Sequence, residues 1–262
     1  MHPLLTTAVK AARQAGKIII RSLSQLDRLE VAVKGRNDFV SEVDHAAEGA
    51  ILDVILHTYP GHGILAEESG RREGRDYEWV IDPLDGTTNF LHGHPQFAVS
   101  IAVRYRGRLA HAVIFDPLRD ELFTASTGRG AQLNDRRMRV SNVRRLEDAL
   151  LGTGFPFRSL GHLDWWLRSF RSLLTKSSGI RRAGSAALDL AYVASGRFDG
   201  FWEIGLSPWD TAAGCLLIQE SGGLVSDLDG SQNHVETGNI VAGNSYLHPE
   251  LLKILQTEPL KA

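Results

Sequence analysis

The sequence contains few of the residues that build disulfide frameworks, membrane spans or nucleic-acid surfaces. Cys215 is its single cysteine, which excludes a disulfide framework and a cysteine-based zinc site and favours a reducing cytoplasm as its location. No apolar run approaches the ~18–20 residues that a membrane span requires. The formal net charge is −2 and the pI is near 6.6, so no overall positive field would attract nucleic acid. The composition predicts a cytoplasmic protein that does not enter a membrane.

Sequence motifs for nucleotide cofactors are also absent. Neither G-x-G-x-x-G nor a Walker sequence occurs, and no internal repeat, linker or low-complexity tract interrupts the chain. The 262 residues, of which 43% are hydrophobic, are enough for a large core. We therefore expect one domain over residues 1–262, built from two closely packed halves at about 1–140 and about 141–262.

The first 26 residues allow two interpretations. They carry four basic residues and no acid, which is the composition of an organelle transit peptide. Their apolar residues nevertheless recur at helical spacing, at Leu5, Ala8, Val9, Ala12, Gly16, Ile19, Ile20 and Leu23. We favour a first helix that packs on the core, with a targeting segment as the alternative.

Strand patterns come in runs rather than in strict alternation with helices, which favours a layered α+β fold over a Rossmann sheet. Helices are expected at about 42–57, 163–174, 184–196 and 209–223, and from His248 onward. Strands are expected within 63–70, 77–83, 97–105, 109–115, 121–127, 150–156, 198–205, 223–230 and 239–244. Period-two alternation is clearest from Phe97 to Tyr105.

Two aspartates are crowded together in "WVIDPLDGTTNF". Pro83 fixes its own φ and pushes Asp82 into an extended conformation. We therefore expect a buried strand to end at Asp82 and a turn to bring Asp85 to the same side, with the Leu84 carbonyl as a further oxygen ligand. Two carboxylates ~4 Å apart repel by about 4 kcal/mol at an effective dielectric constant near 20. A hard cation such as Mg²⁺ would relieve that repulsion.

The segment Gly86-Thr87-Thr88 is predicted to start a helix or helix-like turn whose N–H groups suit a phosphate. Carboxylates beside such an anion site repel the anion unless a cation lies between them, and the strand that ends at Glu67 supplies another acid. A simple surface turn is the alternative, because turns favour Asp, Pro and Gly. "FDPLRDE" (115–121) lacks the Gly-Thr-Thr sequence and is interpreted as a connecting turn without a metal.

These residues resemble a known family. "WVIDPLDGTTNF" is similar to the first signature of the inositol monophosphatase family, and "WDTAAGCLLIQESGG" is similar to its second. Further stretches resemble the bacterial SuhB-type branch of that family, namely "KGRNDFVSEVD", "ILAEESG", "FAVSIAVR", "TGFPF", "GSAALDLAYVASGRFDGFWEIG" and "TGNIVAGN". The resemblance covers nearly the whole chain.

The resemblance implies a layered αβαβα sandwich of the inositol monophosphatase and fructose-1,6-bisphosphatase type. It also implies a homodimer that hydrolyses phosphate monoesters with two to three Mg²⁺ ions and is inhibited by Li⁺. The metal and phosphate residues would lie in the first half and most substrate-facing residues in the second. A metal-acidified water would attack phosphorus in line, without a covalent intermediate.

The resemblance also assigns roles to individual residues. The implied metal ligands are Glu67, Asp82, Asp85, Asp210 and the carbonyl of Leu84. The implied catalytic residues, which support the attacking water, are Glu67, Thr87 and Asp44. The implied phosphate ligands are the N–H groups of Gly86 and Thr87, and the implied substrate-binding residues are Asp85, Ala186, Glu203 and Asp210.

Several of these residues have simpler interpretations. Asp210 starts a helix, where an acid is a good cap in any protein, and Glu203 would also fit a solvent-facing strand. His92 and His94 have a spacing that can bind zinc, but no soft ligand lies nearby in the sequence. Cys215 is interpreted as a small core residue rather than a nucleophile.

Two other functions remain open. Fructose-1,6-bisphosphatase and 3′-phosphoadenosine 5′-phosphate phosphatase share the metal site, so a broader phosphatase is one alternative. The SuhB-type resemblance implies the other, a regulator that binds RNA polymerase and Nus antitermination factors. Basic clusters at 136–139 and 144–145 are the only local sign of such a partner, and clusters of this kind are often simply solvated.

Overall fold

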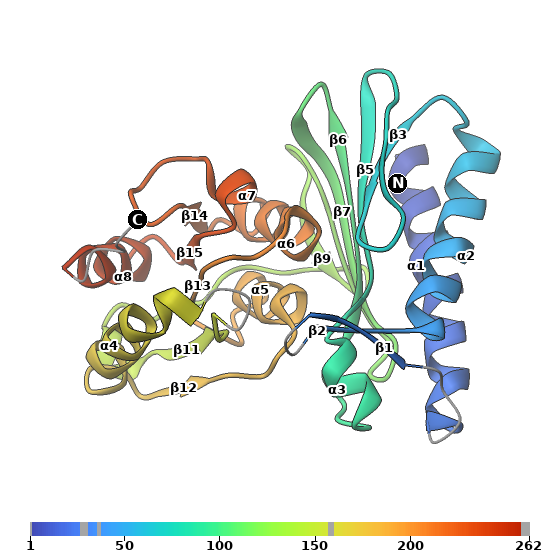
Figure 1. Cartoon of the computed structure of the whole chain (residues 1–262). Coiled ribbons are helices and arrows are strands. Elements are labelled where there is room, and N and C mark those ends of the chain that lie inside the picture. The colour runs from blue at the N-terminus through green and yellow to red at the C-terminus, as the bar shows by residue number, and fades with distance from the viewer. Residues whose placement is uncertain (1, 27–30, 36–37, 157–159, 258–262) are drawn as a thin grey trace.

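The computed structural model describes residues 2–26, 31–35, 38–156 and 160–257. Five layers succeed one another across the molecule: two helices, a large sheet, two helices, a small sheet and two further helices (Figure 1). The predicted αβαβα sandwich is therefore confirmed. Within the described residues, no helix is long and apolar enough to cross a bilayer.

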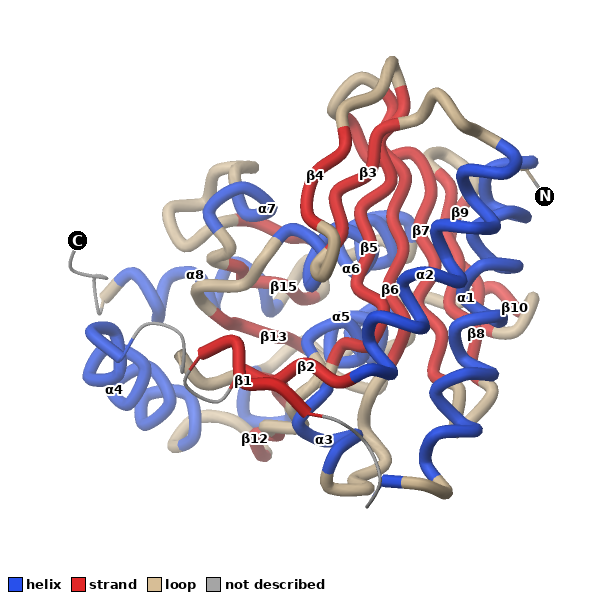
Figure 2. Tube along the Cα trace, turned by 45° about the vertical axis from the view of Figure 1, so that its right-hand side comes forward, coloured by secondary structure: helices blue, strands red, loops and turns tan. Residues whose placement is uncertain are grey.

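The first two layers are formed by the N-terminal part of the chain. Helices α1 (Pro3–Leu23) and α2 (Glu42–Thr58) cover one face of a mixed eight-stranded sheet (Figure 2). Its strand order is β10-β9-β8-β7-β6-β5-β3-β4. In chain order the strands are β3 (Gly63–Ala66), β4 (Gly70–Arg72), β5 (Tyr77–Asp85), β6 (Ala98–Tyr105), β7 (Arg108–Asp116), β8 (Glu121–Ser126), β9 (Gly130–Leu133) and β10 (Arg136–Arg137).

The alternation along β6 separates two cores rather than a core and solvent. Val99, Ile101 and Val103 pack with α1 and α2, whereas Ala98 and Ala102 belong to the cluster on the opposite face. Large side chains therefore fill one side of the sheet. The small side chains on the other side let helices approach the sheet closely.

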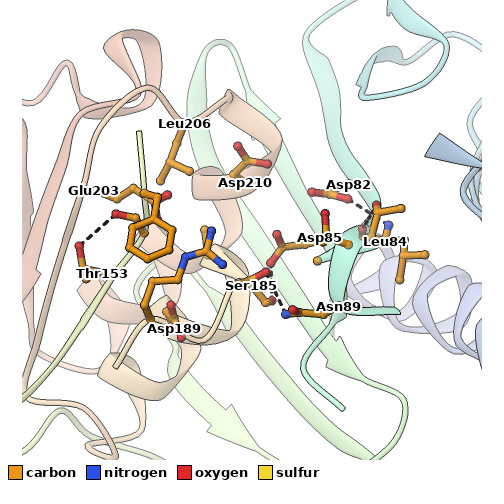
Figure 3. A pocket seen from close by; sticks show the side chains of 18 of the residues that line it. Asp82, Leu84, Asp85, Asn89, Thr153, Ser185, Asp189, Glu203, Leu206 and Asp210 are labelled. Atoms are coloured by element: carbon orange, nitrogen blue, oxygen red, sulfur yellow. Dashed lines mark hydrogen bonds between the residues drawn. The ribbon is translucent and has the colours of Figure 1, made fainter. Parts of the chain in front are cut away.

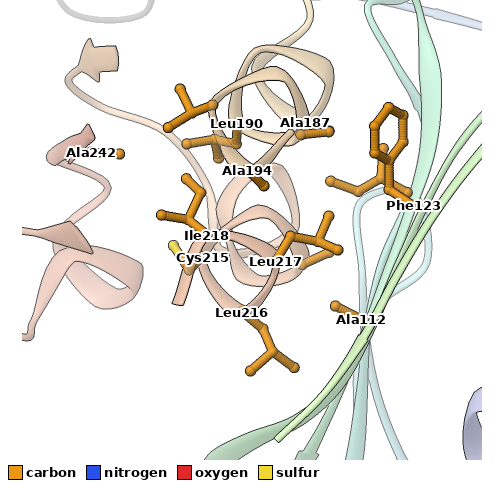
Figure 4. Close-up of a cluster of buried hydrophobic side chains, with 14 of the residues drawn as sticks. Ala112, Phe123, Ala187, Leu190, Ala194, Cys215, Leu216, Leu217, Ile218 and Ala242 are labelled. Atoms are coloured by element: carbon orange, nitrogen blue, oxygen red, sulfur yellow. The ribbon is translucent and has the colours of Figure 1, made fainter. Parts of the chain in front are cut away.

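Two helices fill the space between the sheets. They are α5 (Ala186–Ala194) and α6 (Pro208–Glu220), whose side chains pack together with those of both sheets (Figure 4). Residues 210–218 of α6 are all buried, as expected for a helix that is surrounded by protein rather than lying at a surface.

The second sheet has five strands in the order β12-β11-β13-β15-β14. These are β11 (Leu150–Thr153), β12 (Gly179–Arg181), β13 (Gly200–Glu203), β14 (Leu224–Ser226) and β15 (Ile240–Gly243). Its outer face packs on α4 (Leu163–Leu174) and α8 (Leu247–Gln256) through Trp165, Trp202 and Leu251. Three short elements complete this half, 3₁₀ turns at Leu146–Asp148 and Leu160–His162 and helix α7 (His234–Thr237).

Most predicted elements are present, and the first 26 residues contain the expected core-packing helix. The prediction that the strand ends at Asp82 is wrong, because β5 continues to Asp85. Several short elements were not predicted: the hairpin of β1 (Val31–Gly35) and β2 (Asp38–Ser41), and strands β4, β9, β10 and β12. Their few residues give a periodic pattern too little length to be recognised.

Candidate metal and phosphate site

A bulge in β5 points both of its aspartates toward the same face of the sheet. Asp82 lies opposite Ser100 of β6 and Asp85 lies opposite Ala98. Between these two pairs, two residues of β5 therefore face a single residue of β6. In a regular strand, residues three apart point to opposite faces. The extra residue corrects this difference, and Pro83 is tolerated there because a bulge interrupts the ladder of hydrogen bonds.

The face that carries both aspartates also faces the start of α6. Ser100 Oγ donates to the carbonyl oxygen of Trp209 at 3.1 Å, which places the first turn of α6 against β6. Asp210 follows directly, and one oxygen of each of Asp82, Asp85 and Asp210 lies within 4.8 Å of the others. Residues more than 120 positions apart in the sequence thus form one buried carboxylate cluster (Figure 3).

Asp210 caps its helix in addition to joining this cluster. Its Oδ2 accepts a hydrogen bond from the Ser207 N–H at 2.7 Å, which completes a capping box at the N-terminus of α6. The capping interpretation of Asp210 is therefore confirmed, and the same carboxyl group also belongs to the cluster. The cap fixes the direction of the carboxyl group, so the helix start orients the acid toward β5.

Burial and mutual repulsion raise the pKa values of the β5 acids. Burial is the largest cause of the strongly raised pKa of Asp82, followed by the charges of Glu67, Asp85 and Asp210. Burial and then Asp210 raise the pKa of Asp85 to about 7. The ionised form of these acids is therefore unfavourable in free energy unless a cation compensates the negative charge.

The site also contains Glu67 and Leu84. Glu67 follows β3, and its N–H donates to the Ile81 carbonyl oxygen at 3.2 Å, which continues the parallel pairing of β3 with β5. Both Glu67 and Leu84 line the same cavity as the three aspartates. The Leu84 N–H donates to Asp82 Oδ1 at 3.0 Å and thereby helps to hold that carboxyl group.

Gly86 and Thr87 form the turn after β5, at the start of the short helix α3 (Thr87–Leu91). Gly86 has φ 93°, and a Cβ there would lie 2.8 Å from the Gln96 carbonyl oxygen, so only glycine fits without strain. The N–H groups of a first helical turn have no carbonyl partner within the helix. The expected helix-like turn is confirmed, and both residues line the cavity.

Asp44 lies behind Thr87 and is fully buried. The Thr87 hydroxyl lies 2.8 Å from Asp44 Oδ1, to which it donates, and 3.0 Å from the Leu84 carbonyl oxygen. Asp44 Oδ2 accepts from the N–H and the hydroxyl of Ser41, at 2.8 and 2.6 Å, in the capping box of α2. Asp44 therefore contacts Thr87 and can act on the site through it.

The second half of the chain meets Asp85 at the N-terminus of α5. Asp85 Oδ2 accepts hydrogen bonds from the Ser185 hydroxyl and from the Ala187 N–H, the latter at 2.8 Å. Ser185 is also the N-cap of α5, because its hydroxyl accepts from the Leu188 N–H.

Part of the wall of this cavity comes from the second half of the chain. Ala186 and Glu203 line it, as predicted, in a cavity of about 310 Å³, at the small end of the usual range for ligand pockets. Glu203 is buried rather than facing solvent. A Cβ on Gly154 would fall 1.8 Å from Glu203 Oε1, so this glycine makes room for the carboxyl group.

Every predicted site residue except Asp44 lines this cavity. Asp189 and Asn89 line it as well, and neither was predicted. Asp189 could have been noticed as the one acid within the apolar "AALDLAYVA" of α5. The role of Asn89 becomes visible only in the fold, where its amide donates to the carbonyl oxygens of Gln96 and Ala183 at 2.8 and 2.9 Å.

Three other sequence candidates lie outside the site. Neither His92 nor His94 belongs to a group of three possible metal ligands among the residues that the structure describes. Cys215 is fully buried, and burial raises the pKa of its thiol. Asp116 accepts from the N–H groups of Leu118 and Arg119, so the "FDPLRDE" segment is a connecting turn, as predicted.

The donor set fits a hard divalent cation. All donors are oxygens, which suit Mg²⁺ rather than softer metals. Three carboxylates share one buried position, and the Glu67 charge acts on the same place. Such a cluster is stable in its charged form only when positive charge lies among its members.

Known proteins resemble the chain over nearly its whole length. The profile of the inositol monophosphatase family matches residues 1–260. The curated protein "Nus factor SuhB" of Pseudomonas aeruginosa is 58% identical over 262 residues, covering 98% of this chain and 97% of that protein. The protein of the same name in Escherichia coli K12 is 53% identical over 260 residues, with the same two coverages.

Solved structures give the same result. The extragenic suppressor protein suhB of Bartonella henselae has a TM-score of 0.96 and 45% identity, covering 98% of this chain and 100% of that one. An inositol monophosphatase from Anabaena has a TM-score of 0.87 and 41% identity, covering 98% and 96%. The fold, the two signature segments and these matches agree, and the chain belongs to the inositol monophosphatase family.

Proposed function

We propose that the protein is a Mg²⁺-dependent, Li⁺-sensitive phosphatase that hydrolyses myo-inositol 1-phosphate to inositol and phosphate. The observation that carries this proposal is the buried cluster of Asp82, Asp85 and Asp210, whose ligand atoms lie within 4.8 Å of one another, beside the turn at Gly86 and Thr87. Membership of the family supports a phosphatase in general, and the site chemistry supports a metal-dependent one.

Each residue has a defined task in this proposal. Asp82, Asp85, Asp210, Glu67 and the Leu84 carbonyl would hold two to three Mg²⁺ ions. When bound, Mg²⁺ supplies positive charge that neutralises the phosphoryl oxygens and acidifies a water.

Thr87 would orient the attacking water. Because its hydroxyl proton is directed to Asp44, the oxygen lone pairs of Thr87 are available to accept a hydrogen bond from that water. Glu67 would accept a further proton of the same water. The N–H groups of Gly86 and Thr87 would donate to phosphate oxygens, in the way that donors stabilise charge developing on a transferred group. Asp44 positions Thr87 and does not itself touch the substrate.

The alcohol part of the substrate would lie against the second half of the chain. Ala186 and Glu203 line that wall together with Asp85 and Asp210, so backbone and carboxyl groups would bind the hydroxyls of inositol. Related sites accept other phosphates, and a broader sugar phosphatase, acting on fructose 1,6-bisphosphate or 3′-phosphoadenosine 5′-phosphate, is the alternative within the same chemistry.

Phosphate release from the three substrates tests this proposal directly. We expect a Mg²⁺-dependent rate on myo-inositol 1-phosphate that Li⁺ inhibits and that Asp82→Asn abolishes. A higher kcat/KM on either of the other two phosphates would keep the chemistry and overturn the substrate. No Mg²⁺-dependent rate on any phosphate, from folded protein, would overturn the enzyme.

We propose as a second function that the protein binds RNA polymerase and Nus factors, because relatives 53–58% identical to it are named Nus factor SuhB. Its basic clusters give this proposal little support. Arg145 is paired with Glu147 and Asp148, whereas Arg136 and Arg137 are exposed on the edge strand β10. Binding of the purified chain to polymerase and Nus factors at low salt is the expected result. Failure to bind either would contradict this role.

We further propose that the protein acts as a cytoplasmic homodimer. Its single cysteine is buried and free, which suits a reducing compartment, and the family resemblance supports a dimer. Light scattering of the purified chain should give twice the 28.8 kDa of one copy, and a monomer at micromolar concentration would contradict the dimer.

A further inference from the structure

Asp189 is a buried acid in an apolar helix, and it has no role in the proposed reaction. It lies on α5 with 1% of its surface exposed, and it lines the cavity (Figure 3), as Arg182 and Glu203 do. Its Oδ1 has no hydrogen-bond partner among the residues that the structure describes. A buried polar atom without a partner costs free energy and calls for an explanation in function or in a bound group.

The charges around Asp189 indicate what kind of group would satisfy it. Burial is the largest cause of its strongly raised pKa, followed by repulsion from Glu203 and Asp85, and the attraction of Arg182 is smaller. The Arg182 guanidinium instead stacks on the Phe155 ring, 4.4 Å from its centre. A wall that carries two acids disfavours a second anion and favours neutral hydrogen-bond donors, which alcohol hydroxyls supply.

Figure 3 shows Asp189 and Glu203 on the side of the cavity away from Asp82 and Leu84, which lie on the strand that leads into the turn at Gly86 and Thr87. Ala186, one turn before Asp189 on the same helix, is a lining residue, and residues three or four apart lie on one face of a helix. A phosphate at Gly86 and Thr87 would therefore direct its ester-linked alcohol toward Asp189 and Glu203.

We propose that Asp189 is a specificity-determining residue that binds a hydroxyl of the polyol part of the substrate and, with Glu203, disfavours substrates with a second phosphate. This proposal rests on the proposed phosphatase function. It adds a residue that would make the site select polyhydroxylated monophosphates. The residue selects the alcohol and takes no part in the attack on phosphorus.

Comparing two substrates separates this role from a structural one. Myo-inositol 1-phosphate offers hydroxyls to Asp189, whereas p-nitrophenyl phosphate offers none. We expect Asp189→Ala to lower kcat/KM on the inositol ester about tenfold, mainly through KM, which corresponds to the loss of one buried hydrogen bond. On p-nitrophenyl phosphate we expect a change of less than about twofold. Asp189→Asn, which keeps one acceptor oxygen, should lose about threefold on the inositol ester and gain activity on fructose 1,6-bisphosphate.

A matched control is available in the same half of the chain. Asp199 is also a buried acid, but its Oδ2 accepts from the Leu150 N–H at 2.6 Å and it does not line the cavity. Asp199→Asn should lower stability and leave the ratio of the two substrates unchanged.

Each result has a distinct meaning. Equal losses on both substrates in the Asp189 variants would overturn the specificity role. If Asp189→Ala does not fold, an unchanged substrate ratio in Asp189→Asn would overturn it. No Mg²⁺-dependent turnover of either substrate by the unaltered, folded protein would instead overturn the phosphatase itself, and the present inference with it.

Discussion

Asp82 is the residue on which the charge balance of the site depends most strongly. It is 1% exposed, and this burial first, and then the charges of three nearby acids, raise its pKa well above the ordinary value. Such an arrangement is suited to ligand binding rather than to stability, because the folded protein without metal must either take up protons or bear the repulsion.

Replacing Asp82 with asparagine should therefore stabilise the metal-free protein. We expect the free energy of unfolding in EDTA to rise by about 1–3 kcal/mol, since one member of a repelling cluster becomes neutral. Added Mg²⁺ should stabilise the unaltered protein and have little effect on the variant. Thermal unfolding with EDTA and with Mg²⁺ measures both effects. The control is Asp53→Asn at an exposed position of α2, and destabilisation of Asp82→Asn in EDTA would contradict the expectation.

His111 provides a residue-scale prediction that is independent of the metal site. Burial, and then the charge of His2 stacked on it, lowers the pKa of His111 to about 4. An unfolded histidine has a pKa near 6.5, so below that pH the unfolded chain binds a proton that the folded chain does not. Stability should therefore fall as the pH drops from about 6.5 toward 4.

The variant His111→Asn should reduce this pH dependence. Between pH 7.5 and pH 5 we expect its loss of unfolding free energy to be smaller than that of the unaltered protein by about 1–2 kcal/mol. Asparagine keeps a hydrogen-bonding group beside Ser126 Oγ, which lies 2.8 Å from His111 Nδ1. Urea unfolding at the two pH values measures the difference, and identical losses in both proteins would count against the predicted shift.

At the scale of elements, the site consists of the ends of strands and helices held by neighbouring elements. The bulge ends β5, the cap begins α6, and Glu48 on α2 holds the loop after β3. Glu48 accepts from the N–H groups of Glu68 and Ser69 at 2.9 and 2.8 Å. It therefore fixes the backbone directly after Glu67 without lining the cavity.

Glu48→Gln should weaken this loop anchor. One of the two N–H groups would then face an amide N–H₂ group instead of an acceptor, at a cost of about 1–2 kcal/mol in stability. If Glu67 is a metal ligand, the Mg²⁺ concentration for half-maximal phosphate release should also rise severalfold, with a smaller change in the rate at saturating Mg²⁺. Asp53→Asn on the same helix is the matched control. An unchanged Mg²⁺ requirement would show that Glu48 does not position Glu67.

At the scale of the whole molecule, the cavity lies where the two halves of the chain meet. Asp85 from the first half accepts hydrogen bonds from Ser185 and Ala187 of the second. Asn89 donates to Ala183 and Gly184 across the same boundary, at 2.9 and 3.2 Å. The relative position of the halves therefore sets the distance between the β5 aspartates and the cavity residues of the second half, such as Asp210 and Glu203.

Asn89→Ala should loosen this boundary. We expect a loss of about 1–2 kcal/mol of stability and faster amide hydrogen exchange at residues 183–187, because these residues lose their contact with α3. Exchange measured by mass spectrometry distinguishes a loosened boundary from general destabilisation. Equal acceleration throughout the sheet would indicate the latter.

The sequence by itself determined most of the helices and strands, and it predicted the acids and the turn that line the cavity. Acids at strand ends, a Gly-Thr-Thr turn and two signature segments predicted the site. Clear periodicity also predicted most helices and strands, because a buried face requires regular apolar spacing. The predicted helix at 163–174 coincides with α4.

Only the tertiary structure decided how these residues meet. The bulge at Pro83 places Asp82 and Asp85 on one face, a result that depends on pairing with β6 and not on local propensity. The position of Asp210 in the carboxylate cluster and the bonds of Asn89 to Ala183 and Gly184 join distant segments, and the burial of Asp189 with an unpaired oxygen also results from packing. Local sequence carries no record of such contacts, because each depends on the packing of the five layers.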